Sequence, residues 1–225
     1  MKQTSLSIKK VPLFRNITER DLLRLLGCLS ATRRTYDKGE TVFMAGQAAE
    51  HVGIICSGGV HVFTEDFMGN RTILAALSDS ELFGEAFACA GTARLPVSVV
   101  AVSKSEIMLI NYRKIIATCP ATCIFHSKLI ENMLSIVASK NVALSQKVEI
   151  ISKRTTRDKL TAYLSAQAVH TGRRKFTIPF DRQDLADFLC VERSAMSAEL
   201  SKMQREGLVC TNRSEFELMT MPEMD

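Results

Sequence analysis

The stretch that most constrains this chain runs from residue 181 to residue 209, and it has the pattern of two helices joined by a tight turn. Asp181 is suited to cap the first helix, because its carboxylate can accept hydrogen bonds from the free amides of the first turn. Gly207 is suited to end the second helix. Apolar or small residues recur at helical spacing on one face of each helix. They are Leu185, Ala186 and Leu189 in the first helix and Met196, Leu200 and Met203 in the second. The segment therefore predicts a helix-turn-helix, whose second helix lies in the DNA major groove.

Short β-strands are predicted on both sides of this helix pair. Residues 176–178 precede it, and residues 208–211 and 216–219 follow it as a hairpin pattern around Asn212-Arg213-Ser214. A strand, two helices and a hairpin make a winged helix. The alternative is an ordinary helical hairpin packed on a core, in which Arg193 is a solvated surface charge. The flanking strands favour DNA binding over that alternative.

The DNA contacts are predicted at the outward positions of this module. Arg193, at the start of the second helix, can make a bidentate contact to guanine O6 and N7. The candidate contact residues are Arg182, Gln183, Arg193, Ser194, Ser197, Ala198, Lys202 and Arg213. Total charge is a weaker argument: the chain carries +5, but residues from 152 onward hold 12 Lys and Arg against 11 Asp and Glu, a net of +1. DNA binding must therefore depend on where the basic residues lie.

Length and composition exclude several classes of protein. The 225 residues suffice for a sensory domain and a small DNA-binding domain. No segment reaches the about 18 unbroken apolar residues that a membrane span needs, and the N-terminus has no signal-peptide core. Seven cysteines without regular spacing argue against a secreted disulfide framework. We therefore expect a cytoplasmic protein without a membrane partner.

The N-terminal half changes from a helical to a strand-like period near Arg33. Residues 1–32 are predicted to be helical, with Thr18 as a cap. Six short apolar runs with glycine turns between them then predict a small antiparallel roll or barrel, at residues 41–44, 52–56, 59–63, 72–75, 97–101 and 107–110. A roll of this size encloses either its own side chains or one small ligand. Residues 82–94 are the candidate ligand segment, because Gly84 lets backbone amides approach an anion, although glycine here is equally explained as a turn former.

A single long helix is predicted from about Pro120 to Ile151. One set of positions alternates by four and three, as in a coiled-coil seam: Ile130, Leu134, Val137, Asn141, Leu144, Val148 and Ile151. A buried Asn at position a of such a seam fixes the register and favours two parallel strands. A second stripe suits packing on the chain's own domain: Leu129, Met133, Ile136 and Ala143. An amphipathic helix packed only on its own domain is the alternative, but two stripes together predict a parallel homodimer.

With roll, long helix and winged helix in this order, the chain resembles the cyclic-AMP receptor protein and fumarate–nitrate regulator (Crp/Fnr) family. The resemblance covers almost the whole chain. It is carried by Tyr36-Asp-Lys-Gly-Glu with Gly46, the Gly58-Gly59 turn, Phe83-Gly84-Glu85, and Asp181-Arg-Gln-Asp-Leu-Ala through Arg193-Ser-Ala-Met-Ser. The fold class implied is α+β: an N-terminal antiparallel β-roll of the cyclic-nucleotide-binding type (a double-stranded β-helix), a long dimerisation helix and a C-terminal winged helix-turn-helix. We place these domains at 1–119, 120–152 and 153–225.

The resemblance also implies a function. It predicts a homodimeric transcription regulator, not an enzyme, in which a small effector in the roll reorients two recognition helices on a pseudo-palindromic DNA operator. RNA polymerase is the further partner it implies. The recognition helix departs from the family pattern, because Ala198 replaces a common second arginine and Ser194 replaces a frequent Glu. We therefore expect an operator unlike that of the cyclic-AMP receptor.

The effector segment departs from the family pattern as well. The cyclic-nucleotide branch has Arg-Ser or Arg-Thr just before the strand, where this chain has Leu95-Pro96, with Arg94 one position early. Its adenine-binding hydroxyl residues correspond in our register to Val142 and Ala143, whose side chains neither donate nor accept hydrogen bonds. Cyclic AMP is therefore not expected, and Glu85 is expected to lack its Arg partner. The candidate effector pocket comprises Phe83, Gly84, Glu85, Ala86, Arg94, Leu95, Pro96, Val97, Val142 and Ala143.

Other cofactors lack a sequence signature. Only Cys28 lies near the N-terminus, so the four-cysteine iron–sulfur arrangement is absent, and the four histidines are dispersed, which argues against haem. Two rival readings of the roll stay open. It can be a scaffold whose pocket is plugged by Phe87, Leu95 and their neighbours, or a cupin-like enzyme. His51 and His61 lack the clustered metal-ligand pattern that a cupin needs.

Overall fold

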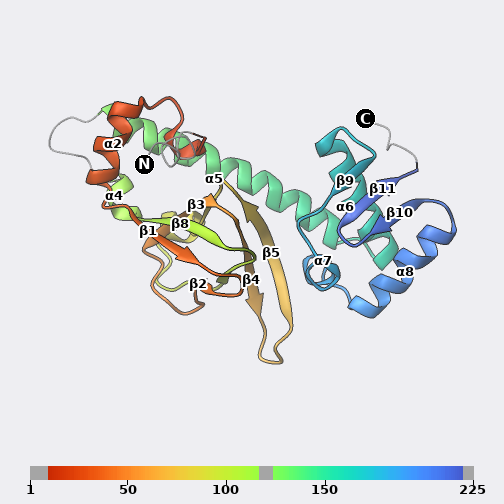
Figure 1. Ribbon diagram of the computed structural model, residues 1–225. Helices are drawn as coiled ribbons and strands as arrows, with labels where there is room; N and C mark the ends of the chain where they lie inside the picture. Colours follow the sequence, from red (N-terminus) through yellow and green to blue (C-terminus); the bar gives the residue numbers. More distant parts are fainter. Residues whose placement is uncertain (1–9, 117–123, 220–225) are drawn as a thin grey trace. The chain divides into compact units, whose positions relative to one another are not determined.

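The computed structural model describes residues 10–116 and 124–219 of the chain (Figure 1). The chain divides into two compact units, Met1–Asn70 with Leu74–Asn141 and Arg71–Ile73 with Val142–Asp225. The division falls inside the long helix, between Asn141 and Val142. The expected start of that helix at Pro120 lies outside the described residues. The three-domain division at 1–119, 120–152 and 153–225 remains a prediction.

The N-terminal unit is an antiparallel roll of two four-stranded sheets, ordered β1-β8-β3-β6 and β2-β7-β4-β5. A short 3-10 turn (Pro12–Phe14) and α2 (Glu19–Cys28) precede it, and Thr18 caps α2 by accepting from the Asp21 amide. The strands are β1 (Thr32–Tyr36), β2 (Thr41–Phe43), β3 (His51–Ser57), β4 (Gly59–Glu65), β5 (Arg71–Ser78), β6 (Leu82–Phe83), β7 (Ser98–Ala101) and β8 (Ser105–Asn111). Two short helices, α3 (Glu85–Cys89) and α4 (Tyr112–Ile116), follow β6 and β8.

Strand β3 separates two hydrophobic cores, because successive side chains of a strand point to opposite faces. Val52, Ile54 and Cys56 pack in a core that includes residues of α2 and of the long helix. Ile55 faces the other core, inside the roll. Gly53 has to be glycine, since a Cβ there would lie 2.1 Å from the Phe83 ring.

The interior of the roll is filled by the chain's own side chains. Phe43 and Phe83 meet edge to face with their ring centroids 5.2 Å apart. Leu95 is buried in the same core, and Phe87 packs against it. The remaining buried members of this core are Ala49, Ile55, Val60, Val99 and Ile107.

The long helix, α5 (Ile124–Ile151), is continuous (Figure 1). It carries two different rows of apolar residues. Leu129 and Met133 are buried in the core of the N-terminal unit, and Ile136 packs against it. Most of the predicted seam is instead open, with Ile130 45% exposed and Leu134 70%, but Val137, also expected in the seam, packs against the core of the N-terminal unit. Leu144 and Val148 continue this exposed row beyond the division between the units.

The C-terminal unit has the predicted winged-helix elements. After α5, helix α6 (Thr156–Thr171) buries Leu160, Tyr163 and Leu164, the three residues expected to face inward. Helices α7 (Arg182–Leu189) and α8 (Arg193–Arg205) follow, and a three-stranded sheet has the order β10-β11-β9. Its strands are β9 (Lys175–Thr177), β10 (Val209–Asn212) and β11 (Glu215–Leu218).

The α+β fold class is confirmed, and all six predicted strands of the roll are present within a few residues of their expected bounds. Two strands were not predicted. β1 contains Thr-Arg-Arg-Thr-Tyr and is mostly exposed, so it has no apolar alternation to reveal it. β6 has only two residues. Among the described residues, no helix is both long and apolar enough to cross a membrane.

Candidate DNA-binding surface and roll site

The turn between α7 and α8 is built by local hydrogen bonds. Asp181 and Asp184 form a capping box at the start of α7, with the Asp184 amide 2.9 Å from Asp181 Oδ1. Cys190 takes the left-handed conformation that ends this helix, with φ of 53°. Lys159 of α6 donates to the carbonyl oxygens of Leu189 and Cys190, each at 3.2 Å. These contacts set the point from which α8 begins at Arg193.

Helix α8 has one buried and one open face. Met196, Leu200 and Met203 are all buried, as predicted. On the other face, Ser197 is half-buried and the remaining candidate contact residues of α8 are exposed. These are Arg193, Ser194, Ala198 and Lys202. A helix held by one face and open on the other can enter a groove. Its N-terminal turn carries Arg193, the residue suited to read a guanine.

The remaining candidates lie outside α8. Arg213 is exposed at the tip of the β10–β11 wing, with φ of 52°. Gln183 is exposed on α7, and its amide nitrogen donates to Asp187 Oδ1 at 2.7 Å. Arg182 is half-buried. Its guanidinium donates to Thr211 Oγ1 at 2.6 Å and lies over the Phe216 ring, 5.0 Å from the centroid. Burial lowers the pKa of Arg182. Arg182 therefore joins α7 to the wing, in addition to any contact it makes with DNA.

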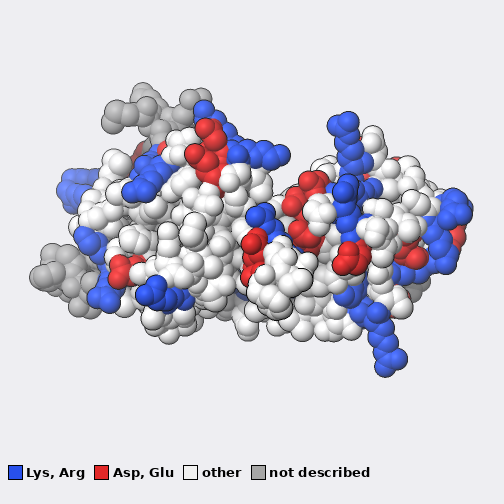
Figure 2. Space-filling view, turned by 90° about the horizontal axis from the view of Figure 1, so that it is seen from below, with Lys and Arg blue, Asp and Glu red and all other residues white. Residues whose placement is uncertain are grey.

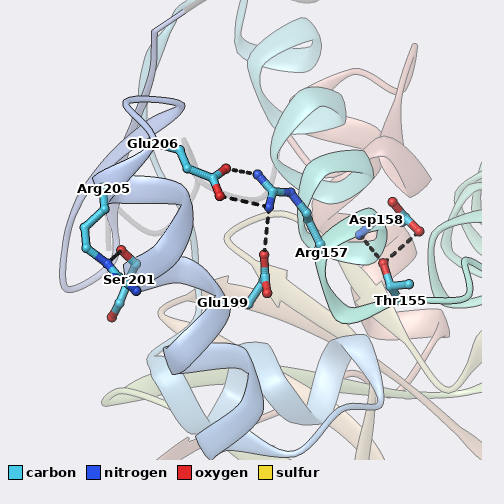
Figure 3. Close-up of polar contacts among 7 residues, drawn as sticks. All are labelled: Thr155, Arg157, Asp158, Glu199, Ser201, Arg205 and Glu206. Carbon is cyan, nitrogen blue, oxygen red and sulfur yellow. Dashed lines mark hydrogen bonds and ion pairs between the residues drawn. The ribbon is translucent and has the colours of Figure 1, made fainter.

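Arg157, which the sequence did not suggest, forms ion pairs with α8 and with the residue that follows it (Figure 3). Arg157 lies at the start of α6. Its guanidinium makes a bidentate hydrogen bond to the carboxylate of Glu206, the residue just beyond the end of α8. It also lies 3.3 Å from Glu199 Oε1, seven residues earlier on α8. The hydrogen bond to Glu206 raises the pKa of Arg157 and lowers that of Glu206. One arginine thus contacts two carboxylates, one on α8 and one at its C-terminal cap, and offsets part of their negative charge.

The surface charge agrees with the small net charge of the C-terminal part. Figure 2 shows basic and acidic side chains interspersed on the face that it draws. On this face, phosphate attraction therefore depends on particular exposed basic residues.

In the roll, the candidate effector residues separate into buried and exposed groups. Phe83, Glu85, Leu95 and Val97 are buried, whereas Ala86 and Pro96 are exposed. Arg94 is also exposed, and it donates to the Gly46 carbonyl oxygen at 2.7 Å. Val142 and Ala143 are exposed and fall on the other side of the division at Asn141. The effector pocket as a whole therefore stays a prediction.

Gly84, between Phe83 and Glu85, has φ of 81°, which favours glycine. A Cβ at this position would lie 3.0 Å from the His51 carbonyl oxygen and 3.1 Å from the Phe43 ring. The glycine is therefore explained by backbone conformation and close packing.

Glu85 is paired with a lysine, a partner that the search for a family-type arginine did not suggest. Its Oε1 lies 2.7 Å from Nζ of Lys140, on α5. The Lys140 ammonium also donates to the Leu82 carbonyl oxygen. The sequence argument sought an arginine near the strand that follows, whereas the charge comes from a residue some fifty positions away, on another element.

Two known domain families match the chain. Residues 33–120 match the cyclic nucleotide-binding domain, and residues 158–224 match the Crp-like helix-turn-helix domain. The chain belongs to the Crp/Fnr family of transcription regulators. It is thus a DNA-binding transcription regulator, and its family consists of regulators rather than enzymes.

Curated relatives and solved structures agree with this assignment. The chain is 23% identical over 205 residues to the cyclic AMP receptor protein of Thermus thermophilus, covering 90% of this chain and 89% of the relative. It is 22% identical over 223 residues to the transcriptional activator protein FnrA of Stutzerimonas stutzeri, covering 97% and 88%. The fold is similar to that of the c-di-GMP responsive regulator CLP of Xanthomonas campestris, with a TM-score of 0.71 and 16% identity over 88% of this chain and all of that one.

Proposed function

We propose that this Crp/Fnr regulator acts as a parallel homodimer, joined through α5, that binds a pseudo-palindromic operator with one α8 in each half-site. The observation that carries the proposal is the open seam of α5. Four large apolar side chains along it are between 45% and 70% exposed: Ile130, Leu134, Leu144 and Val148. A regular exposed apolar row of this kind marks an interaction surface, and its coiled-coil spacing calls for a matching helix.

Asn141 supports a second copy of the chain as that matching helix. With Ile130 at position d of the seam, Asn141 falls at position a, where an asparagine favours two parallel strands. Parallel packing would relate the two α8 helices by a twofold axis, and a twofold dimer requires a pseudo-palindromic operator. Contact with RNA polymerase belongs to the same proposal as the means by which bound protein acts on transcription.

Two candidate modes of control follow from the roll. Effector-independent binding is favoured by its interior, because Leu95 and Phe87 belong to a core built from the chain's own side chains. Control by a small effector other than cyclic AMP is favoured by Glu85, whose Oε2 is buried and has no hydrogen-bond partner among the described residues. A cupin-like enzyme is not supported, since the described residues contain no group of three or more metal-ligating side chains.

Selection of bound sequences from random duplex DNA by the purified, metabolite-free protein tests the proposal. A recovered pseudo-palindrome with a guanine in each half-site is expected. Sedimentation of wild type beside Leu134→Glu tests the seam, because a charge at this exposed position should separate the protomers. Leu23→Glu is the matched control, since Leu23 is 66% exposed and lies on another helix, α2. A wild-type monomer, or recovery of an asymmetric single site, would reject the dimer.

A further inference from the structure

A buried ion pair joins the roll to the long helix. The Glu85 side chain is only 3% exposed, and its Oε1 lies 2.7 Å from the Lys140 ammonium, whose side chain is 33% exposed. Removing a carboxylate from water is unfavourable unless a counter-charge and hydrogen bonds replace the water. Lys140 supplies this counter-charge at Oε1, while Oε2 has no hydrogen-bond partner among the described residues. The buried Glu85 carboxylate therefore has its counter-charge only while α5 keeps this position.

Lys140 occupies a position where an apolar residue would be expected. Leu129, Met133 and Ile136 follow one another at intervals of four and three on the face of α5 that packs on the roll. Lys140 comes four residues later, so it extends the same stripe. A lysine can do this because its aliphatic stem packs while its ammonium reaches a polar partner. The hydrogen bond to the Leu82 carbonyl oxygen, from β6, adds a second attachment to the same part of the roll.

The place of this attachment along α5 gives it importance. Asn141, the next residue, is the polar position of the proposed dimer seam and the last residue of the N-terminal unit. Successive helical residues point about 100° apart, so fixing Lys140 toward the roll also fixes the direction of Asn141. The ion pair therefore sets the rotation of the helix at the point where it leaves the roll.

We propose that Lys140 is a built-in counter-ion that holds α5 in the DNA-binding arrangement without an added ligand. Lys140 supplies the positive charge beside Glu85, so no bound effector is needed to provide it. This inference rests on the proposed dimer, since it acts through the rotation of the seam. It assigns effector-independent binding to one residue of the chain.

Three variants test the pair: Lys140→Met, Glu85→Gln and the two together. Affinity for the selected operator and for random duplex DNA is measured by fluorescence anisotropy, with the oligomeric state checked by sedimentation. Each single variant is expected to bind the operator about tenfold more weakly, with affinity for random DNA unchanged, as for a coupling of moderate size. The double variant should lose no more than either single variant, because both changes remove the same interaction. Glu85→Gln keeps the shape of the side chain, so it provides the test if Lys140→Met does not fold.

The matched control is Lys128→Met. Lys128 lies on the same helix and pairs with Glu131 at 3.1 Å, but its side chain is 40% exposed and that of Glu131 70%. This variant should bind the operator as wild type does. Millimolar cyclic AMP should leave the operator affinity of the wild type unchanged.

Three results would overturn the inference. They are full operator affinity in the single variants, additive losses in the double variant, and stronger wild-type binding in the presence of cyclic AMP. Failure of the wild type to select a pseudo-palindrome would count against the proposed function instead. The two failures are thus distinguishable.

Discussion

The two units use ion pairs in different ways. In the roll, Glu85 is almost wholly buried and is held by a lysine from another element. In the winged helix, Arg157 is 33% exposed, and its partners Glu206 and Glu199 are 37% and 22% exposed. A buried carboxylate left alone is strongly unfavourable, whereas exposed partners can be rehydrated. Loss of the Glu85–Lys140 pair should therefore affect folding and the rotation of α5. Loss of the Arg157 contacts should mainly affect the orientation and charge of α8.

The largest effect on stability is expected from Lys140→Met. It should lower the free energy of unfolding of the N-terminal unit by about 2 kcal/mol, which is less than the about 3–5 kcal/mol typical of fully buried pairs, because Lys140 stays partly in water. Glu85→Leu with Lys140→Met should recover most of this loss, since an apolar pair leaves no buried charge. Urea unfolding followed by circular dichroism measures both. Unaltered unfolding of the single variant would contradict the contrast between the two units.

Arg193→Ala sharpens the contrast from the side of DNA. Arg193 is exposed at the start of α8, so its removal should leave unfolding unchanged. It should weaken operator binding by about 1–3 kcal/mol with little change on random DNA, because a base contact is lost. Lys202→Ala is the comparison, and it should weaken binding to the operator and to random DNA by the same factor. Equal losses on both DNAs for Arg193→Ala would remove its base-reading role.

A buried lysine in the C-terminal unit gives a pH dependence. Lys147 is 6% exposed, with its ammonium 4.1 Å from the centroid of the Phe188 ring. Burial lowers the pKa of Lys147 from 10.5 to about 8. Between these values the unfolded chain binds more protons than the folded chain, so stability should rise with pH from about 8 to about 10.5.

Lys147→Met tests this assignment. It should stabilise the unit by about 1–2 kcal/mol at neutral pH, because the unfavourable buried charge is gone, and the advantage should fade by pH 10. Thermal unfolding of both proteins across this range is the measurement. Cys190 acts electrostatically on Lys147, so both proteins also carry Cys190→Ser, which removes that interaction from the comparison. An advantage that stays constant with pH would show that packing, and not charge, is responsible.

The smallest effect is expected from Arg157→Gln. The melting temperature should fall less than in Lys140→Met, because both sides of this contact reach solvent. Operator affinity should fall a few-fold at low salt and less at high salt, since two uncovered carboxylates on α8 repel phosphates and salt screens that repulsion. Lys153→Gln is the control, because its pair with Glu149 lies wholly on α5. A defect independent of salt would mean that Arg157 orients α8 without an electrostatic part.

The winged helix could be predicted from sequence because its signals are local. Asp181 and Gly207 mark helix ends, and Met196, Leu200 and Met203 repeat at helical spacing, so caps and periodicity point to the same elements. Two periodic rows on α5 were likewise visible, but Val137 of the seam row packs against the core and Ala143 of the roll-facing row is exposed.

The roll site could be predicted only in part because its contacts are not local. Glu85 and Lys140 are far apart in the chain, and a lysine on an apolar stripe does not show where its ammonium ends. Two features of the sequence pointed to the pair: Lys140 continues the spacing of Ile136 on α5, and Glu85 lacks the arginine of the family pattern. Arg157 was missed for the same reason, since its partners lie on α8, more than forty residues later.

The continuity of α5 has a geometric consequence for DNA recognition. From Asn141 to Ile151 the helix is a straight arm of about 15 Å, at 1.5 Å per residue. A tilt of about 10° at the base of such an arm moves its far end by about 3 Å. That displacement is close to the about 3.4 Å that separates neighbouring base pairs along DNA. A tilt of about 10° at Asn141 is therefore enough to displace the C-terminal end of α5 by nearly one base-pair step.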